Sequence, residues 1–452
     1  MNRRQFLLGS LASAGLVSSP MTMGMNLGLG QRLLAQTSTP IVGYKALVCI
    51  FLYGGHDSLN LLVPTDATEY NSYAHTRQNL AYAPEAVTPI TPLQTPTYSV
   101  GMPSSATSLL ELFNQDKLVI VSNVGPMREM AVKDQILANK ALRPPQLFSH
   151  NDQQALWQAG VDSTNVTTGW AGRMADLLMD TSNPLSMNMT TYGSNLWQSG
   201  IQAQSFAVNT EGPQTFDGLD PAQDWNLYRY DAFARIRALS SHPLTQEYSR
   251  RIDTAEVNNT KLIEALAQLT PSNIDYPRRN PLSDQLKMTA DLIQSQTLLG
   301  HNRQIFFVGL GGFDTHDNQV ERLPDLVNKI GDAMLAFQND LTARGVSQYV
   351  TTFTQSDFGR TLTSNGDGTD HGWGGHQLVM GDDVIGRTIA GALPSFALGS
   401  SDDLEDGRII PTTSVEQYGA ALGRWFGLSD TDLQQVFPNL NRFASDTVNV
   451  LR

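Results

Sequence analysis

The stretch VTTFTQSDFGRTLTSNGDGTDHGWGGH, residues 350–376, gathers acids, imidazoles and glycines after an apolar run typical of a buried strand. Its polar side chains are Asp357, Arg360, Asp370, His371 and His376. Carboxylates and imidazoles together are ligands of zinc or manganese, whereas calcium and magnesium prefer oxygen ligands alone. The mixture therefore predicts a divalent metal site that favours zinc or manganese, with calcium or magnesium possible.

Similar polar groups follow two other apolar runs. His56, Asp57 and Ser58 follow the first, and Asp314, His316 and Asp317 follow a strand predicted at 304–310. Five of the eight histidines fall in these loops or in LFSHNDQQALW. Functional groups collect beyond the carboxyl ends of strands in open α/β sheets. The predicted metal ligands are Asp57, Asp314, His316, Asp357, Asp370, His371 and His376.

Each short motif also has a simpler interpretation. An Asp after a strand commonly caps a helix or forms a turn. In DTH and DH, one loop could supply two ligands, or one ligand and the acid that orients it. The acids and imidazoles could also form a hydrogen-bond network without metal.

Ser149, Arg360 and Arg173 are the candidate catalytic residues. Ser149 in LFSHNDQQALW precedes a predicted helix, where a nucleophile or an anion would face free N–H groups. Plain N-capping is the alternative for Ser149. Arg360 and Arg173, the latter in GWAGR, could hold a phosphate or sulfate through their planar forks, or pair with structural carboxylates.

Four apolar runs must position these loops. They are KALVCIFLYGG, KLVIVSNVG, RQIFFVGLGG and QYVTTFTQS, and each is typical of a strand buried on both faces. Between the last two, ERLPDLVNKIGDAMLAFQNDLTARG has helical apolar spacing, with Gly345 as a C-terminal cap. The pattern predicts an α/β fold with a mostly parallel central sheet sandwiched by helices.

Residues 224–299 contain three amphipathic helical patterns without an intervening strand. We interpret them as a helical insertion within one α/β domain over 37–452, and expect it over or beside the carboxyl edge of the sheet.

The N-terminus, MNRRQFLLGSLASAGLVSS, places Arg3 and Arg4 before a short apolar run, as in a twin-arginine signal peptide. Cleavage near Ala35 would remove residues 1–36. The apolar run at 6–17 is too short to span a bilayer, and we find no second candidate span. We therefore expect a periplasmic or secreted protein that uses the twin-arginine export machinery and keeps no permanent membrane span.

Composition narrows the class of protein. The 452 residues are 40% hydrophobic and 16% charged, which is typical of a globular protein. The net charge of -13 argues against a nucleic-acid partner. Cys49 is the single cysteine in the sequence, so no intramolecular disulfide can form, and we expect it to be a small buried side chain.

The sequence resembles a large family of exported bacterial proteins of unknown function. The matching blocks, in order, are FLYGGHDSLNLLVP, SHNDQQALW, GWAGR, GGFDTHDNQ, SDFGRTLTSNGDGTDHG and GLSDTDLQQVFPNL, and they span nearly the whole mature chain. That family is grouped with the alkaline phosphatase and sulfatase superfamily. The resemblance implies an alkaline phosphatase-like fold with one or two metals at the carboxyl edge of its sheet.

The resemblance also implies roles for individual residues. Asp57 matches the first aspartate ligand, Ser149 a possible nucleophile with Ser58 as a second candidate, and Asp314 with His316 an Asp and His pair that is two residues apart instead of four.

The closing block fits the superfamily pattern in two registers. In one, Asp370 and His371 are the ligand pair and His376 is the last histidine. In the other, Asp357 is the aspartate and His371 the last histidine. The second register puts Phe358 where a histidine would ligate, so a second metal would be weakened or absent.

These features together predict a metal-dependent hydrolase that acts on a small phosphate or sulfate ester. The alternative is a metal-stabilised binding or envelope-assembly protein with the same fold and no turnover.

Overall fold

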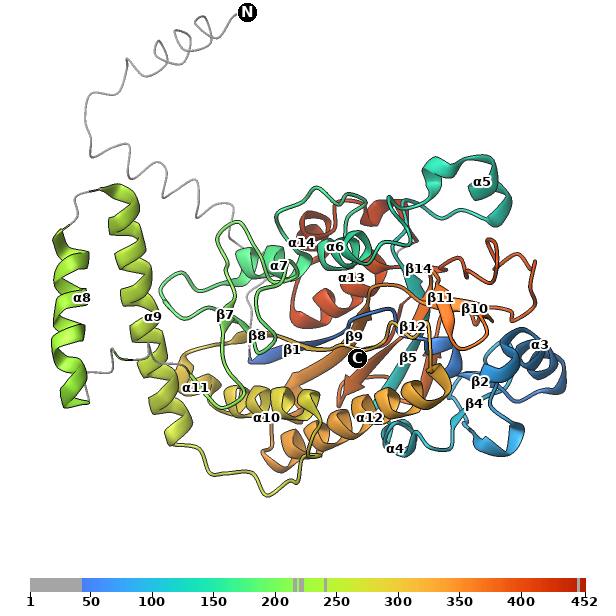
Figure 1. The fold of residues 1–452 in the computed structure, drawn as a ribbon, viewed down its shortest axis with the longest axis horizontal. Coiled ribbons are helices and arrows are strands. Elements are labelled where there is room, and N and C mark those ends of the chain that lie inside the picture. Colours follow the sequence, from blue (N-terminus) through green and yellow to red (C-terminus); the bar gives the residue numbers. More distant parts are fainter. Residues whose placement is uncertain (1–42, 214–217, 219–222, 240–241, 445–447) are drawn as a thin grey trace, which may run out of the picture.

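The computed structural model describes residues 43–213, 218, 223–239, 242–444 and 448–452 (Figure 1). The predicted signal peptide at 1–36 lies outside these residues. Within the described ranges, none of the helices has both the length and the hydropathy that crossing a bilayer requires.

A central sheet of nine strands runs through the described part of the chain, in the order β13-β5-β12-β9-β1-β8-β6-β7 with β14 beside β5 (Figure 1). The strands are β1 (Lys45–Leu52), β5 (Leu118–Gly125), β6 (Asn188–Thr190), β7 (Phe206–Ala207), β8 (Arg303–Leu310), β9 (Val350–Ser356), β12 (Gly375–Gly381), β13 (Thr388–Ala390) and β14 (Thr413–Ser414). β12 runs antiparallel to β5 and β9, whereas β1 is parallel to both β8 and β9. The prediction of a mostly parallel α/β sheet is confirmed.

β1 shows why its sequence is apolar at every position. Ala46, Val48, Ile50 and Leu52 pack into the core on one face of the sheet, and Leu47, Cys49 and Phe51 pack into the core on the other. Since successive side chains of a strand point to opposite faces, a strand covered on both sides needs apolar residues throughout. Cys49 is fully buried, and burial raises the pKa of its thiol.

Helices cover both faces of the sheet (Figure 1). One layer contains α4 (Thr107–Asn114), α10 (Pro281–Gln294) and α12 (Gln319–Ala343), and the other contains α6 (His150–Ala159), α7 (Trp170–Leu178), α13 (Val415–Phe426) and α14 (Asp430–Val436). α12 is the crossover helix predicted between β8 and β9. Gly345, just beyond its end, has a φ of 70°, as a C-terminal cap requires.

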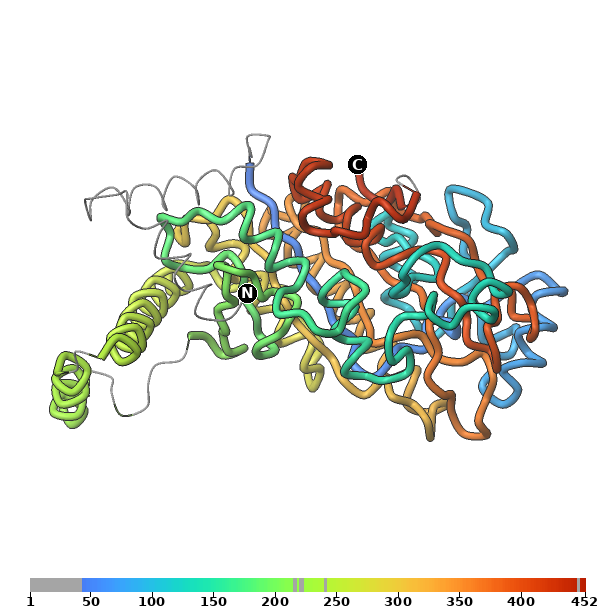
Figure 2. The backbone as a smooth tube through the Cα atoms, turned by 90° about the horizontal axis from the view of Figure 1, so that it is seen from above, coloured from blue at the N-terminus to red at the C-terminus, as the bar shows by residue number. Residues whose placement is uncertain are grey.

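The helices of residues 224–299 divide into two parts. α8 (Leu227–Leu239) and α9 (Pro243–Ala267) stand out from the body in both views (Figures 1 and 2). α10 instead packs on the sheet, where the Gln285 side chain bonds both the N–H and the carbonyl of Gly309 in β8, at 2.9 and 2.8 Å. α11 (Gln296–Leu299) follows α10 directly.

The α8–α9 pair is attached near the amino end of β8. Lys261 of α9 donates to the carbonyl of Leu299 at 2.7 Å, and β8 begins four residues later. Our expectation of a position at the carboxyl edge is therefore not met. Amphipathic periodicity identifies the helices, but not the end of the sheet to which they attach.

Smaller elements complete the fold. They are α3 (Ala67–Arg77), α5 (Lys133–Ala138), the small sheet of β2 (Val63–Pro64), β3 (Val87–Pro89) and β4 (Val100–Pro103), and the ribbon of β10 (Arg360–Ser364) and β11 (Thr369–His371). The ribbon pairs Arg360 with His371, which carries both residues to the carboxyl edge of the central sheet.

Candidate metal centre

Segments that are far apart in the sequence meet at the carboxyl edge of the central sheet. Asp314 follows β8, Asp357 follows β9, His150 begins α6 and His371 ends β11. Ligand atoms of His150, Asp314 and His371 all lie within 4.8 Å of one another. Asp314 is exposed and both histidines are half-buried, so the group is open to solvent.

Asp314 lies at the centre of three imidazoles. Its Oδ1 atom is 3.0 Å from His316 Nε2 and 3.3 Å from His371 Nε2. Its Oδ2 atom is 3.5 Å from His150 Nε2. In each of these contacts the histidine presents its Nε2 atom to the carboxylate.

The other ring nitrogen of each histidine is held by an oxygen acceptor. The Nδ1 contacts are 2.6 Å from His150 to Asp357 Oδ2, 3.2 Å from His316 to Asp370 Oδ1 and 2.8 Å from His371 to the carbonyl of Phe148. An acceptor at Nδ1 keeps the proton there and leaves the Nε2 lone pair free, as in metal-ligating histidines. The three rings are therefore oriented to ligate through Nε2.

Two of these lone pairs face each other. His316 Nε2 and His371 Nε2 lie 2.9 Å apart. With both protons on Nδ1, two electron-rich nitrogens at this distance repel unless a proton or a cation lies near them. Because the donors are imidazole nitrogens and a carboxylate, the group fits zinc or manganese, while calcium and magnesium prefer sites of oxygen alone.

Burial and neighbouring groups shift the pKa values of His150, His371 and Asp314. The hydrogen bond to Asp357 raises the pKa of His150, outweighing its burial. Burial lowers the pKa of His371. For Asp314, burial acts to raise the pKa, but the hydrogen bond and the charge of Arg360 bring it below its usual range. Asp314 is therefore a carboxylate at neutral pH, as a ligand must be.

Asp357 and Asp370, which the sequence predicts as ligands, instead contact the Nδ1 atoms of His150 and His316. Asp357 is fully buried and accepts from the backbone N–H of Gly54 at 3.2 Å and from Gln154 Nε2 at 2.9 Å, in addition to His150. Asp370 accepts from Asn365 Nδ2 at 3.2 Å in addition to His316. Both acids orient imidazoles in this geometry and do not join the ligand group.

Asp57 lies apart from the group, contrary to its predicted role as a ligand. Its two oxygens lie 2.5 and 2.6 Å from one guanidinium nitrogen of Arg77, and Gln319 Nε2 donates to Oδ2 at 2.5 Å. Both side chains of the ion pair are fully buried. Arg77 is the last residue of α3, and together with Gln319 it uses both oxygens of the Asp57 carboxylate.

His376 and Ser58 also lie outside the group. His376 Nδ1 accepts from the N–H of Asn123 at 3.2 Å, and the N–H of His376 donates to Ser58 Oγ at 2.6 Å. Burial lowers the pKa of His376 to about 3 and that of His56 to about 4. His56, Ser58 and His376 are thus buried side chains outside the group. Of the two registers, the one with His371 as the last histidine agrees with this geometry at His371, but its aspartate, Asp357, bonds His150 and is not part of the ligand group.

The two arginines predicted to bind an anion are occupied elsewhere. Arg360 is fully buried and donates to Asp314 Oδ1 at 2.8 Å, to the Gly54 carbonyl and to Thr369. Arg173 donates to the carbonyls of Val436, Thr168 and Ala159, so it ties the start of α7 to α14 and α6. Arg360 thus positions Asp314, and Arg173 has a structural role.

Ser149 lies beside the group. It is the N-cap residue of α6, but its hydroxyl makes no capping hydrogen bond in the described structure. Its two neighbours in sequence both take part in the site, since the Phe148 carbonyl accepts from His371 and His150 is a candidate ligand.

Sequence reasoning did not assign a role to His150. Its signal was present, because His150 adjoins the singled-out Ser149 and opens a predicted helix. Its partner Asp357 is 207 residues away, so the pairing becomes visible only in the fold. Phe358 packs against the two histidines of the candidate group, with ring centroids 4.9 Å from His150 and 4.4 Å from His371.

The fold and the site define an α/β protein with a candidate metal centre at the carboxyl edge of its sheet. The chain belongs to the family described as "Protein of unknown function (DUF1501)", which matches residues 44–437. None of the curated proteins compared with it matches.

Several solved structures are similar to the chain at low identity. The C-terminal periplasmic domain of EcEptC from Escherichia coli is 10% identical over 76% of this chain and 74% of that one, with a TM-score of 0.32. The lipoteichoic acid synthase LtaP from Listeria monocytogenes is 8% identical over 89% and 79%, with a TM-score of 0.33. The PsFucS1 sulfatase from Pseudoalteromonas sp. is 9% identical over 92% and 73%, with a TM-score of 0.32.

Proposed function

We propose that the protein is an exported, metal-dependent hydrolase of phosphate or sulfate esters. The observation that carries this proposal is the set of three imidazole Nε2 atoms around Asp314, each with its Nδ1 held by an oxygen. The twin-arginine pattern in residues 1–36 supports export. The motif resemblance to the alkaline phosphatase and sulfatase superfamily supports the choice of ester.

His150, Asp314 and His371 are the proposed ligands. His316, which bonds Asp370 through Nδ1, stays outside the ligand group in this proposal, so that a position remains open for the ester oxygen. A zinc or manganese ion held there would polarise the ester oxygen as a Lewis acid. Asp357, Asp370 and the Phe148 carbonyl fix the orientation of the three rings. Arg360 positions the carboxylate of Asp314 by donating to its Oδ1 atom.

Ser149 is the proposed nucleophile. Its hydroxyl is not used for capping, so it is available to attack the phosphorus or sulfur atom of a bound ester. This attack would break the bond to the alcohol part of the ester, which would leave with the serine proton, and water would then release phosphate or sulfate from Ser149. It also stands at the start of α6, where free backbone N–H groups and the positive end of the helix dipole favour an anionic group. Since Arg360 and Arg173 are occupied, these N–H groups take the anion-holding role that we had expected of the arginines.

The test combines metal analysis with a substrate panel. Mature protein loaded with zinc or manganese is assayed on an aryl phosphate, an aryl phosphodiester and an aryl sulfate. We expect one of the three to be hydrolysed well above a blank. Ser149→Ala should keep stoichiometric metal and lose turnover by at least about 100-fold. Bound metal with no hydrolysis of any of the three would contradict the proposed activity.

One observation favours a second function, that of a metal-stabilised binding protein without turnover. If His316 Nε2 ligates together with the other three side chains, four protein donors surround the ion and leave no open position, as in structural zinc sites. In that case, His316→Ala would open a position that a small external ligand such as imidazole could fill. Ser149→Ala would then change neither ligand binding nor any phenotype.

A further inference from the structure

The backbone carbonyl of Phe148 connects the two segments that carry the histidines of the candidate metal centre. His371 lies at the end of β11, whereas Ser149 and His150 lie at the start of α6. The Nδ1 atom of His371 donates to the Phe148 carbonyl at 2.8 Å, and Ser149 follows Phe148 directly in the chain. A shift of Phe148 would therefore disturb His371 through this hydrogen bond, and Ser149 and His150 through the chain.

The Phe148 ring lies against the guanidinium group of Arg408. The Cζ atom of Arg408 is 4.9 Å from the ring centroid, which is within the range of a cation–π contact. Phe148 is 38% exposed, so the surrounding core encloses its ring only in part. The contact with Arg408 therefore contributes to the position of the ring.

The Arg408 side chain is itself held in place. Its Nη1 atom donates to Asp406 Oδ2 at 2.9 Å and to the Glu405 carbonyl at 3.4 Å, and the side chain is only 24% exposed. An ion pair with an exposed carboxylate contributes little to stability. It does restrict the guanidinium group, so less side-chain entropy is lost when that group covers Phe148.

Arg408 belongs to a turn over residues 403–409 that is bonded to the ribbon of His371. The N–H of Leu362 in β10 donates to the Gly407 carbonyl at 2.8 Å. A Cβ atom at Gly407 would lie 2.9 Å from the backbone nitrogen of Leu362, so the turn lies directly against this strand. Since β10 pairs with β11, the base of Arg408 is fixed relative to His371.

We propose that Arg408 is a positioning residue of the metal centre. Through the Phe148 ring, it holds the loop of Ser149 and His150 against the ribbon of His371, so that both histidines can reach the same ion. The inference rests on the metal centre of the proposed function. It does not depend on ester hydrolysis, because it concerns the binding of metal.

The direction of the effect separates positioning from simple electrostatics. A guanidinium group is positively charged, so its charge alone would disfavour a nearby cation, and its removal would strengthen zinc binding. Loss of a contact that positions ligands would instead weaken zinc binding. Weaker binding after removal of Arg408 therefore indicates positioning.

Zinc titration of the full chain, in competition with a chromophoric chelator, tests the proposal. Arg408→Gln should weaken zinc binding about fivefold, as expected for loss of a cation–π contact. Arg408→Lys keeps a cation over the ring and should restore most of the affinity. Phe148→Leu should weaken binding to a similar extent, and Arg408→Gln added to Phe148→Leu should have no further effect, because the contact is already absent.

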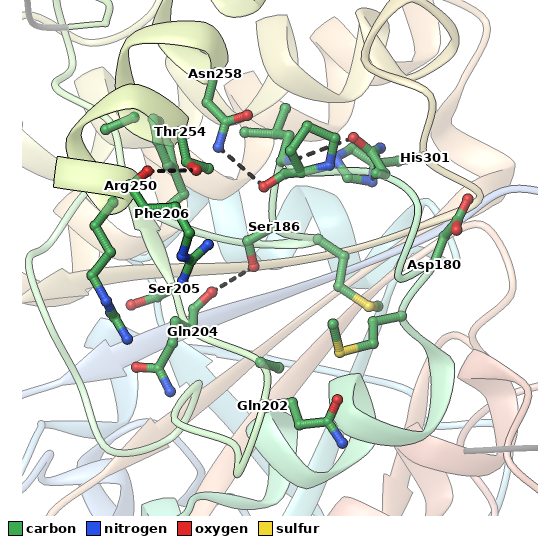
Figure 3. Close-up of a pocket in the computed structure, with 18 residues that line it drawn as sticks. Asp180, Ser186, Gln202, Gln204, Ser205, Phe206, Arg250, Thr254, Asn258 and His301 are labelled. Carbon is green, nitrogen blue, oxygen red and sulfur yellow. Dashed lines mark hydrogen bonds between the residues drawn. The ribbon is translucent and has the colours of Figure 1, made fainter. Parts of the chain in front are cut away.

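Arg250→Gln is the matched control. Arg250 also pairs with an acid, Glu247, at 2.7 Å, and it lines the cavity between α9 and the body of the protein (Figure 3). That cavity includes His301, two residues before β8, so it lies near the amino end of β8 and away from the metal centre. Arg250→Gln should leave zinc affinity unchanged. The visible spectrum of the cobalt-loaded protein, which reports the arrangement of the ligands, should change in Arg408→Gln and stay the same in Arg250→Gln.

Three results would overturn the proposal. They are unchanged or tighter zinc binding in Arg408→Gln, no recovery in Arg408→Lys, and a fivefold loss from Arg408→Gln that persists in the Phe148→Leu background. If the wild-type protein binds zinc normally in these experiments, only the role of Arg408 is refuted. A wild-type protein that binds no zinc would refute the proposed metal centre, and the role of Arg408 with it.

Discussion

Gly54 lies directly against the backbone of Asp314: a Cβ atom at Gly54 would come 2.3 Å from the Asp314 amide nitrogen. The φ of Gly54 is 116°, which also disfavours any other residue. Because the obstructing atom belongs to the backbone, Gly54→Ala must displace Asp314. We expect affinity for zinc or manganese to fall about 10- to 100-fold, as for other changes that disturb ligand orientation.

Gly43→Ala is the matched control for that experiment. Gly43 has a φ of 80°, and a Cβ there would meet nothing within 4 Å. The control therefore carries backbone strain without the clash. A metal titration in which both variants bind as tightly as the wild type would show that Gly54 does not position Asp314.

Metal should stabilise the protein measurably. Without a cation, the facing Nε2 atoms of His316 and His371 must protonate or separate, so removal of metal loosens the site. We expect zinc at 100 times its dissociation constant to add about 2.7 kcal/mol to the free energy of unfolding, and Asp314→Asn to lose most of this gain. Thermal unfolding after chelation and after zinc addition measures both values. An equal gain in Asp314→Asn would indicate that zinc binds elsewhere.

The buried ion pair of Asp57 and Arg77 should be important for folding. Removing one partner leaves a buried charge without compensation, so Arg77→Met should lower the free energy of unfolding by about 3–5 kcal/mol. Adding Asp57→Asn to Arg77→Met removes the second charge and should restore part of the loss. Urea unfolding of the two single variants and the double variant gives the coupling energy. If the loss of unfolding free energy in the double variant equals the sum of the losses in the two single variants, Asp57 and Arg77 are not coupled.

Glu416 provides a prediction about pH. Burial raises the pKa of this carboxyl to about 7, and its Oε2 atom has no partner among the described residues. Between pH 4.5 and 7 the folded protein binds more protons here than the unfolded chain, so stability falls as the pH rises through this range. Glu416→Gln removes that dependence. We expect it to stabilise the protein by about 2 kcal/mol more at pH 8 than at pH 5.

Urea unfolding at pH 5 and pH 8 checks this expectation. Asp402→Asn, at a carboxyl in a different part of the chain, serves as a control for removal of one negative charge. A difference between Glu416→Gln and wild type that is the same at both pH values would contradict the raised pKa.

The strands and the crossover helix could be predicted because their signals are local. The runs at β1, β5, β8 and β9 are apolar at successive positions, and α12 has apolar residues at helical spacing. The loops after β8 and β9 were therefore located correctly from sequence. The rule that parallel strands end at one edge of the sheet accounts for the position of Asp314 and Asp357, which follow β8 and β9.

The role of each polar residue at the carboxyl edge of the sheet depends on its hydrogen-bond and ion-pair partners. Asp57 and Asp314 both follow buried strands and look equivalent in the sequence. They differ because α3 carries Arg77 to Asp57, whereas the ribbon of β10 and β11 carries Arg360 and His371 to Asp314. His150 enters the group only because α6 packs its first residue against Asp357.

The amino-acid sequence was enough to locate the ends of the buried strands and the polar loops that follow them, because runs of apolar side chains are local features of the chain. Which carboxylates face a buried arginine and which face solvent-exposed imidazoles depended on the folded structure. These contacts join residues that are far apart in the chain, and their geometry depends on how the helices and the ribbon pack around the sheet.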